Sequence, residues 1–480
     1  MLFLPQRILR IRQINSCRRP PRRASSHIRY LDNRRMPQQM SVLFLGTSSG
    51  GGPSESRNCS SLVCDLLKDR SLWSFAVVDC AEGTIRQFQL QPSNTYQVRP
   101  NKITKIFITH MHADHIMGIV PLLRNVLFPP PAGSQPSTSS YRAPVSFTLS
   151  CNRRRILSIT FQPKIEIYGP AGIRTFVRQV MKMTFTNTAD NYTVHELLSE
   201  NDPVTPCDHA DPVHPVSRFA IAEQNILHLN EVAGKNIRTS VDGSWKNITR
   251  GSGVLGDIVV NAGPIEHRDP CIGYVFTETR APYRKIVILG DTHDPSAITP
   301  LCINPSPSLL IHEATDAHIP AHADATGRLA KRRPEEVREK ALLRGHSVPE
   351  MAGSFAKRVG AAKLVLNHIG GRFPAPRHSR DGRAMVIREI ERQATQAWDS
   401  GEHAMAAWDF MRVTIPVAED MGHGRGFDSG EDELGEIKTE EVIDMDFDYR
   451  SVSASGSAAW STTTTTTNTE RQWEGKRRRR

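Results

Sequence analysis

The stretch "ITHMHADHIMG", residues 108–118, places three histidines and an aspartate within six positions. The segment before it, "ITKIFITH" at 103–110, has the apolar pattern of a buried β-strand. The polar side chains therefore leave a strand end together, where close spacing lets them converge on one point. Imidazole and carboxylate groups suit zinc, manganese or iron better than calcium or magnesium. The stretch predicts a transition-metal site with four ligands: His110, His112, Asp114 and His115.

Four ligands on one loop divide naturally between two ions, so further ligands are expected at other strand ends. Three residues meet this expectation. His267 precedes the strand "CIGYVFTE", Asp291 follows "RKIVILG", and His368 follows "KLVLN". A carboxylate such as Asp291 can bridge two ions. A pair of ions about 3.5 to 4 Å apart generates a hydroxide near neutral pH and stabilises an in-line displacement, which suits phosphodiester hydrolysis.

The remaining composition indicates one large α/β domain with polar extensions. The chain has 480 residues, of which 38% are hydrophobic, and its mean hydropathy is −0.40. Because no apolar run approaches 18 residues, we expect a soluble globular protein without a membrane span. Short apolar strands alternate with amphipathic helices, which predicts a β-rich α/β fold. The eight cysteines include no CxxC pair, so they fit neither a disulfide scaffold nor a cysteine zinc site.

Charge and composition divide the chain into three parts. Residues 1–40 carry a net charge of +9 and predict a mitochondrial targeting segment or a disordered basic arm, with nucleus and cytoplasm as alternative locations. Residues 41–418 form the predicted catalytic domain, with irregular insertions at about 129–164 and 199–256. Residues 419–480 carry −5, contain a Ser/Thr tract and end in "KRRRR". We expect this last part to be a disordered tail.

The order of the motifs resembles that of a known superfamily. HxHxDH, a histidine before a strand, "GDT", "HEAT", "GHS" and a late histidine are similar to the metallo-β-lactamase superfamily. "FLGTSSG", "RNCSS" and "GHSVPEMA" narrow the resemblance, in patches over about 41–375, to ribonuclease Z, which removes 3′ trailers from precursor tRNA. The resemblance implies a four-layer αβ/βα sandwich, two Zn²⁺ ions with Mn²⁺ as the alternative, and precursor tRNA as the partner. It implies no membrane association and allows a homodimer.

The resemblance also implies a role for each candidate site residue. One ion would be held by His110, His112 and His267, and the second by Asp114, His115 and His368, with Asp291 bridging them. Asp114 would in addition serve as general base. His346, oriented by Glu313, would protonate the departing 3′ oxygen, because a carboxylate partner raises imidazole basicity and fixes its tautomer. The alternative for Glu313 is a buried structural acid.

The loop after the first strand, "GTSSGGGPSESRN", resembles a substrate-binding loop of the family. Pro53, Arg57 and Asn58 match its PxKxRN element, whereas the family's lysine corresponds to Glu55 here. Gly50 to Gly52 could present backbone N–H groups to phosphate, the alternative being a plain connecting turn.

The family's tRNA-gripping arm lies between the residues that match His267 and Asp291. Only 23 residues separate them here, enough for two strands and a turn. We expect the arm to be missing, or else to be replaced by the two insertions. "NRRR" at 152–155 is a candidate phosphate contact, or else a solvated loop.

Two other functions remain open on sequence grounds. One is another hydrolase of the superfamily, such as a cyclic-nucleotide phosphodiesterase, which the missing arm favours. The other is a noncatalytic RNA-binding relative, which the complete set of seven ligands disfavours.

Overall fold

The computed structural model describes residues 40–66, 75–93, 95–127, 163–209, 223–253, 256–378 and 381–416. The predictions for the basic N-terminal segment, for "NRRR" and for the C-terminal tail lie outside the described residues. Within the described ranges, none of the helices is both long enough and apolar enough to cross a membrane.

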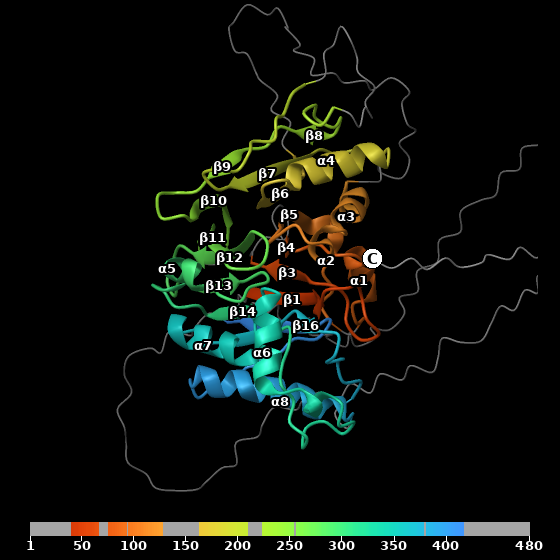
Figure 1. The fold of residues 1–480 in the computed structure, drawn as a ribbon. Helices are drawn as coiled ribbons and strands as arrows, with labels where there is room; N and C mark the ends of the chain where they lie inside the picture. The colour runs from red at the N-terminus through yellow and green to blue at the C-terminus, as the bar shows by residue number, and fades with distance from the viewer. Residues whose placement is uncertain are drawn as a thin grey trace, which may run out of the picture.

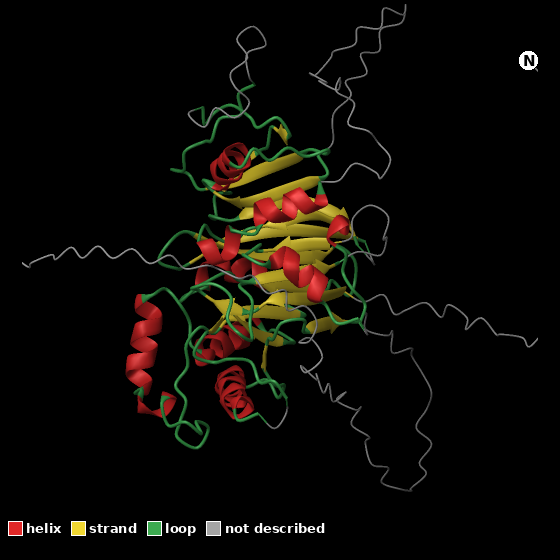
Figure 2. Ribbon diagram, turned by 90° about the vertical axis from the view of Figure 1, so that its right-hand side faces the viewer, coloured by secondary structure: helices red, strands yellow, loops and turns green. Residues whose placement is uncertain are grey.

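Two mixed β-sheets lie face to face, with helices on both outer sides (Figures 1 and 2). The described strands of the first sheet are ordered β18-β1-β3-β4-β5-β6-β7-β8, with β9 also paired to β7. Their bounds are β1 Met40–Gly46, β3 Ser61–Asp65, β4 Phe75–Val78, β5 Ile103–Phe107, β6 Ile165–Pro170, β7 Tyr192–Leu198, β8 Glu231–Val232, β9 Asn236–Arg238 and β18 Arg412–Ile415.

The second sheet is ordered β10-β11-β12-β13-β14-β15-β17. Its strands are β10 Trp245–Ser252, β11 Asp257–Ile265, β12 Cys271–Glu278, β13 Lys285–Ile288, β14 Leu309–Glu313, β15 Leu364–Asn367 and β17 Met405–Ala406. A small parallel pair joins β2 (Ser48–Ser49) to β16 (Ile369–Gly370).

Helices cover the outer faces of both sheets. The α-helices are α1 Thr84–Leu90, α2 Ala113–Ile116, α3 Ile119–Val126, α4 Ile173–Met183, α5 Thr299–Cys302, α6 Pro334–Leu343, α7 Pro349–Val359 and α8 Arg383–Trp398. The 3₁₀ turns are η1 Pro100–Lys102, η2 Ser296–Ile298 and η3 Leu329–Lys331. Buried side chains of α1, α3 and α4 pack against the first sheet, and those of α5, α7 and α8 pack against the second.

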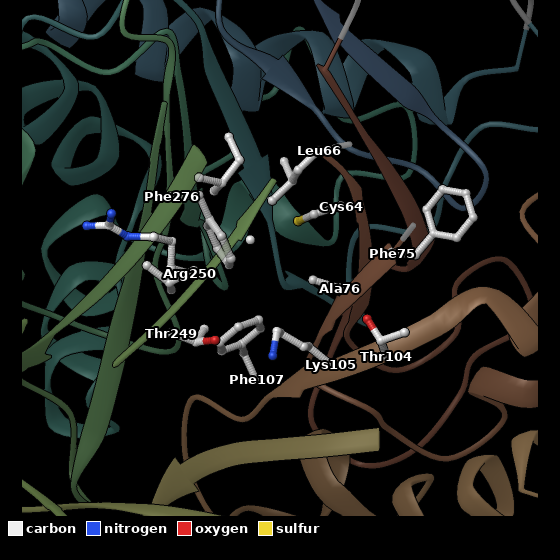
Figure 3. Close-up of a pocket in the computed structure, with 13 residues that line it drawn as sticks. Cys64, Leu66, Phe75, Ala76, Thr104, Lys105, Phe107, Thr249, Arg250 and Phe276 are labelled. Carbon is white, nitrogen blue, oxygen red and sulfur yellow. The ribbon is translucent and has the colours of Figure 1, made fainter. Parts of the chain in front are cut away.

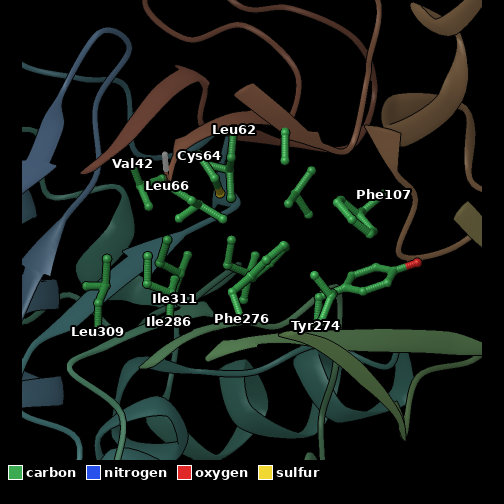
Figure 4. Close-up of a cluster of buried hydrophobic side chains, with 14 of the residues drawn as sticks. Val42, Leu62, Cys64, Leu66, Phe107, Tyr274, Phe276, Ile286, Leu309 and Ile311 are labelled. Atoms are coloured by element: carbon green, nitrogen blue, oxygen red, sulfur yellow. The ribbon is translucent and has the colours of Figure 1, made fainter. Parts of the chain in front are cut away.

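The strands are apolar on both faces because each sheet is buried on both faces. In β1, Val42 and Phe44 point into the core between the sheets, whereas Leu43 and Leu45 pack against the helices. Side chains alternate along a strand, so a strand covered on both sides needs a continuous apolar run. Figure 4 shows the inter-sheet core, where Val42 and Phe107 of the first sheet face Phe276 and Ile311 of the second. The predicted four-layer sandwich is confirmed.

The range 199–256 corrects an expectation. It was expected to be irregular, but it contributes β8, β9 and β10 to the two sheets. The sequence signal is weak because these strands are edge strands with few buried side chains. In β10, for example, only Trp245 and Ile248 are buried.

The strands β12 and β13 form an antiparallel pair joined by a six-residue turn. As predicted from the spacing, they leave no room for an arm at that point.

Strand direction positions the site. The run β4-β5-β6-β7 is parallel, and so is β13-β14-β15. The carboxyl ends of parallel strands lie at one edge of a sheet, and the loops that leave them form the usual site of α/β proteins. His110, Asp291, Glu313 and His368 lie at or just beyond the ends of such strands, so the two sheets bring them to a common edge.

Candidate metal centre

The structure brings together all seven predicted metal ligands. In one group the ligand atoms lie within 4.8 Å of one another, and its members are His110, His112, His267 and Asp291. A second group meets the same limit and contains Asp114, His115 and His368. The two groups divide as the resemblance implied, although metal binding itself stays a prediction.

Asp291 lies between the two groups. Its Oδ2 is 3.6 Å from Nε2 of His110 in the first group. Its Oδ1 is 3.5 Å from Nε2 of His115 and 3.3 Å from Nε2 of His368 in the second. One carboxylate therefore directs one oxygen to each group, which is the arrangement a bridging ligand requires.

The electrostatics of the centre favour a bound cation. Burial would raise the pKa of Asp291, but the charges of His368, His115 and His110 outweigh it and hold that pKa well below the usual range. Burial and the neighbouring His115 keep the pKa of His110 low, so this imidazole is neutral and ready to ligate. Burial would also lower the pKa of His115, yet Asp291 and Asp79 raise it. A metal ion would take the place of the proton that these carboxylates favour.

The donor set fits a transition metal. Nε2 of His267 is buried and has no hydrogen-bond partner among the described residues, while its Nδ1 donates to the carbonyl of Gly345 at 2.6 Å. A buried unpaired nitrogen is costly unless a ligand satisfies it. Five imidazoles with two carboxylates match zinc or manganese rather than calcium or magnesium.

Outer partners orient several ligands, and the sequence analysis assigned no role to them. Asp79, at the end of β4, accepts a hydrogen bond from Nδ1 of His115 at 2.7 Å and others from the N–H and hydroxyl of Thr109 at 2.8 and 3.0 Å. Thr315 lies 2.9 Å from Nδ1 of His368. Asp269 lies 2.7 Å from Nε2 of His112. Asp79 ends a buried strand beside β5, the same signal that located the ligands, so the sequence could have indicated it.

Replacing Asp79 should weaken the second metal group. We expect Asp79→Asn to lower metal affinity about 10- to 100-fold, because an amide cannot hold the Nδ1 proton of His115 as a carboxylate does. Asparagine tolerates the positive φ of 55° at this position. Competition with a chromophoric chelator measures the affinity. The matched variant Asp269→Asn should change it less, since that carboxylate is 57% exposed and water can replace it; an equal loss in both variants would contradict the assignment.

His346 and Glu313 form a second feature beside the ligands. Nδ1 of His346 is 3.0 Å from Oε1 of Glu313, and that carboxylate also accepts hydrogen bonds from the N–H of Thr292 at 2.7 Å and the hydroxyl of Thr315 at 2.5 Å. Burial alone would lower the pKa of His346, but the charge and hydrogen bond of Glu313 outweigh it and raise that pKa. The imidazole is thus held by Nδ1 and can carry a proton, as a general acid must.

The predicted substrate loop is only partly available to a substrate. Pro53 is exposed, but Arg57 is buried, with hydrogen bonds from its guanidinium to Thr47 Oγ1 at 2.7 Å and to the carbonyl of Ala407 at 2.6 Å. Asn58 donates its side-chain N–H to the carbonyl of Glu82 at 3.0 Å. Arg57 and Asn58 therefore have structural positions, and substrate contact by this loop stays a prediction.

Another part of the loop touches the metal centre. The N–H of Gly50 donates to Oδ2 of Asp114 at 2.8 Å. The first loop thus helps to orient Asp114. Glu55, at the position of the family's lysine, pairs with Arg377.

A pocket between the sheets is separate from this centre (Figure 3). Apolar residues such as Phe107 and Phe276 line it, and none of the seven ligands does. Lys105 reaches into it, and burial lowers the pKa of this amine to about 7. The pocket belongs to the inter-sheet core, so we do not place the reaction there.

Known proteins resemble this chain over most of the described range. The profile of the Metallo-beta-lactamase superfamily matches residues 75–134. The zinc phosphodiesterase ELAC protein 1 of Bos taurus is 30% identical over 430 aligned residues, which cover 79% of this chain and 99% of that protein. Ribonuclease Z of Streptococcus sanguinis is 30% identical over 345 residues, covering 70% and 91% of the two chains. The crystal structure of the short form of human tRNase Z (ELAC1) covers 78% of this chain and 100% of its own, at 28% identity and a TM-score of 0.48.

Proposed function

Because this chain belongs to the family of ribonuclease Z and zinc phosphodiesterase ELAC protein 1, a family of metal-dependent hydrolases, we propose that it is a zinc-dependent endoribonuclease that removes 3′ trailers from precursor tRNA. One observation carries the proposal: two groups of candidate metal ligands, with Asp291 in contact with both, lie beside the His346–Glu313 pair. A relative that only binds RNA would have no need of a buried ligand set and a proton donor at the same place.

Seven residues would hold two ions: His110, His112, His267, Asp114, His115, His368 and Asp291. When bound, such ions lower the pKa of water and neutralise charge on the phosphate. Zinc is proposed from the donor set and from the name of the bovine relative, with manganese as the alternative.

The chain's own side chains manage the protons of the reaction. Water attacks the phosphorus and the bond to the 3′ oxygen breaks, which leaves a 3′-hydroxyl on the tRNA and a 5′-phosphate on the trailer. Asp114 accepts the proton of the attacking water; its side chain is 16% exposed and is oriented by the N–H of Gly50. His346, 12% exposed, donates a proton to the departing oxygen while Glu313 holds its Nδ1.

The basic composition of residues 1–40 supports a mitochondrial location for this activity, with nucleus and cytoplasm as alternatives. A homodimer stays a prediction.

The short turn between β12 and β13 favours a second candidate, a phosphodiesterase for small substrates such as cyclic nucleotides. With no arm at that point to hold a large RNA, the centre could serve a small substrate.

One assay separates the two candidates. Purified full-length protein is incubated with a 3′-extended precursor tRNA, with a cyclic nucleotide and with bis(p-nitrophenyl) phosphate, each with and without a chelator. We expect chelator-sensitive cleavage of the tRNA at a single site and of the small ester, with the cyclic nucleotide left intact. Hydrolysis of the cyclic nucleotide with the tRNA left uncut would overturn the tRNA assignment.

A further inference from the structure

A lobe formed by residues 316–344, here called the α6 lobe, stands beside the metal centre. It begins just after Glu313 and ends one residue before Gly345, whose carbonyl accepts the hydrogen bond from the metal-ligand candidate His267. In Figure 1 helix α6 stands in front of the sandwich, and in the turned view of Figure 2 it stands off the body at the left. The C-terminal end of α6 is therefore anchored at the site.

The first part of the lobe is anchored by Ala317, Ile319 and Ala323 in the core of the second sheet, whereas few apolar contacts attach helix α6 itself. Val337 and Ala341, one helical turn apart, pack with Val348 and the partly buried Met351 in a small cluster separate from the three large cores. The other described positions of α6 are exposed or half-buried, and Leu343 is 83% exposed. Only one narrow face of α6 is thus packed against other parts of the protein.

The acids of the lobe are mostly occupied within it. Asp316 makes a two-pronged pair with Arg332, and Glu336 pairs with Arg333. Asp324 accepts hydrogen bonds from the N–H groups that open η3. Apart from these, only Glu335 and Glu339 remain as acidic side chains in the lobe.

The basic side chains of the lobe are largely unneutralised. Five of them are exposed and make no ion pair with another described residue: Arg328, Lys331, Arg338, Lys340 and Arg344. Asp324, Glu335 and Glu339 offset part of this charge, so the lobe keeps a net excess of two positive charges between η3 and the edge of the metal centre. Such an excess attracts a polyanion.

We propose that the α6 lobe binds the phosphate backbone of precursor tRNA next to the scissile bond, with Arg338 and Lys340 as contacts on the two flanks of the helix. This inference rests on the proposed function and adds the surface that holds the substrate. An α-helix of this length extends about 15 Å, and a nucleic-acid duplex carries a charge about every 1.7 Å along its axis. An acceptor stem that lies along α6 would therefore place several phosphates within reach of the helix. The short turn between β12 and β13 offers no second surface that could hold the tRNA at that point.

The test is the affinity of full-length protein for a fluorescently labelled precursor tRNA, measured by anisotropy between 0.05 and 0.3 M salt. A slow-cleaving His346→Ala background keeps the RNA intact. We expect Arg338→Gln/Lys340→Gln to lower the affinity about 10- to 30-fold near 0.15 M salt and to reduce the slope of log affinity against log salt by about 2. Turnover of bis(p-nitrophenyl) phosphate, measured without the His346 change, should stay the same.

Two controls make the result specific. Arg99→Gln/Arg280→Gln removes the same charge from exposed positions. Arg99 precedes β5 and Arg280 follows β12, so each lies at the strand end away from the metal centre. This pair should change the affinity less than about twofold. Arg338→Lys/Lys340→Arg keeps the charge and should bind like the unmodified lobe, which a folding defect would not allow.

The outcomes are distinct. If the protein binds and cleaves precursor tRNA but the α6 and control pairs behave alike, the lobe is a solvated face or binds another partner, and the inference fails while the proposed function stands. If the unmodified protein neither binds nor cleaves precursor tRNA, both fail.

Discussion

Asp291→Ala is expected to lower cleavage of both precursor tRNA and bis(p-nitrophenyl) phosphate by more than about a thousandfold, roughly 4 kcal/mol of transition-state stabilisation. The reason is the position of this carboxylate, with one oxygen 3.6 Å from His110 and the other 3.3 Å from His368. Loss of one side chain should therefore disturb both groups of ligands. Neither substrate should escape the effect, because both need the charge at the centre.

The metal content shows whether Asp291→Ala loses activity because it loses bound metal. Elemental analysis after gel filtration should give about two ions per chain for the unmodified protein and fewer for Asp291→Ala. Asp294→Asn is the matched control, since this exposed carboxylate lies three residues further along and only caps the turn at Ser296. Two retained ions with full activity in Asp291→Ala would contradict the bridging role.

His346→Ala is expected to produce a substrate-dependent loss. Cleavage of precursor tRNA should fall about 10²- to 10⁴-fold, because the departing 3′ alkoxide needs a proton. Bis(p-nitrophenyl) phosphate should be affected far less, since p-nitrophenolate leaves without protonation. The metal content should stay unchanged, because His346 is not among the proposed ligands.

Two further variants check the assignment of His346. Glu313→Gln should also lower tRNA cleavage more than ester cleavage, because the amide holds Nδ1 of His346 less strongly than the carboxylate that now lies 3.0 Å away. His378→Ala, at an exposed histidine, should change neither rate. His346 also lies close to Asp291 and His368 and could itself be a metal ligand. An equal loss of activity on both substrates, together with a loss of metal, would show that it is one.

Most of the metal centre could be predicted from the sequence, because its residues follow strong local signals. A buried strand such as β5 is a continuous apolar run, and a ligand loop at its end is recognisable by residue type alone. All seven candidate ligands are recognisable by such signals, and the resemblance divides them between two groups. Edge strands such as β10 carry no such signal, so the range 199–256 was wrongly expected to be irregular.

The strand-end position of Asp79 could be recognised in the sequence, but its contact with His115 and the burial of Arg57 could not be predicted. Asp79 precedes His115 by 36 residues, and only the parallel pairing of β4 with β5 places its carboxylate against that imidazole. Arg57 looked like a substrate contact on its motif, but the fold surrounds its guanidinium with acceptors from Thr47, Phe373 and Ala407. Burial of a charged group depends on distant segments, which a local motif does not contain.

By itself, then, the sequence determined the residue types of the site, the two-faced strands and the resemblance to ribonuclease Z, because chemistry and apolar periodicity are local properties. Only the tertiary structure decided that Asp79 holds Nδ1 of His115, that the N–H of Gly50 holds Asp114, and that α6 stands beside the centre with basic side chains that pair with no acid of the described residues. Each of these depends on which strand ends meet at one edge, and that is set by the packing of two sheets whose strands lie far apart in the chain.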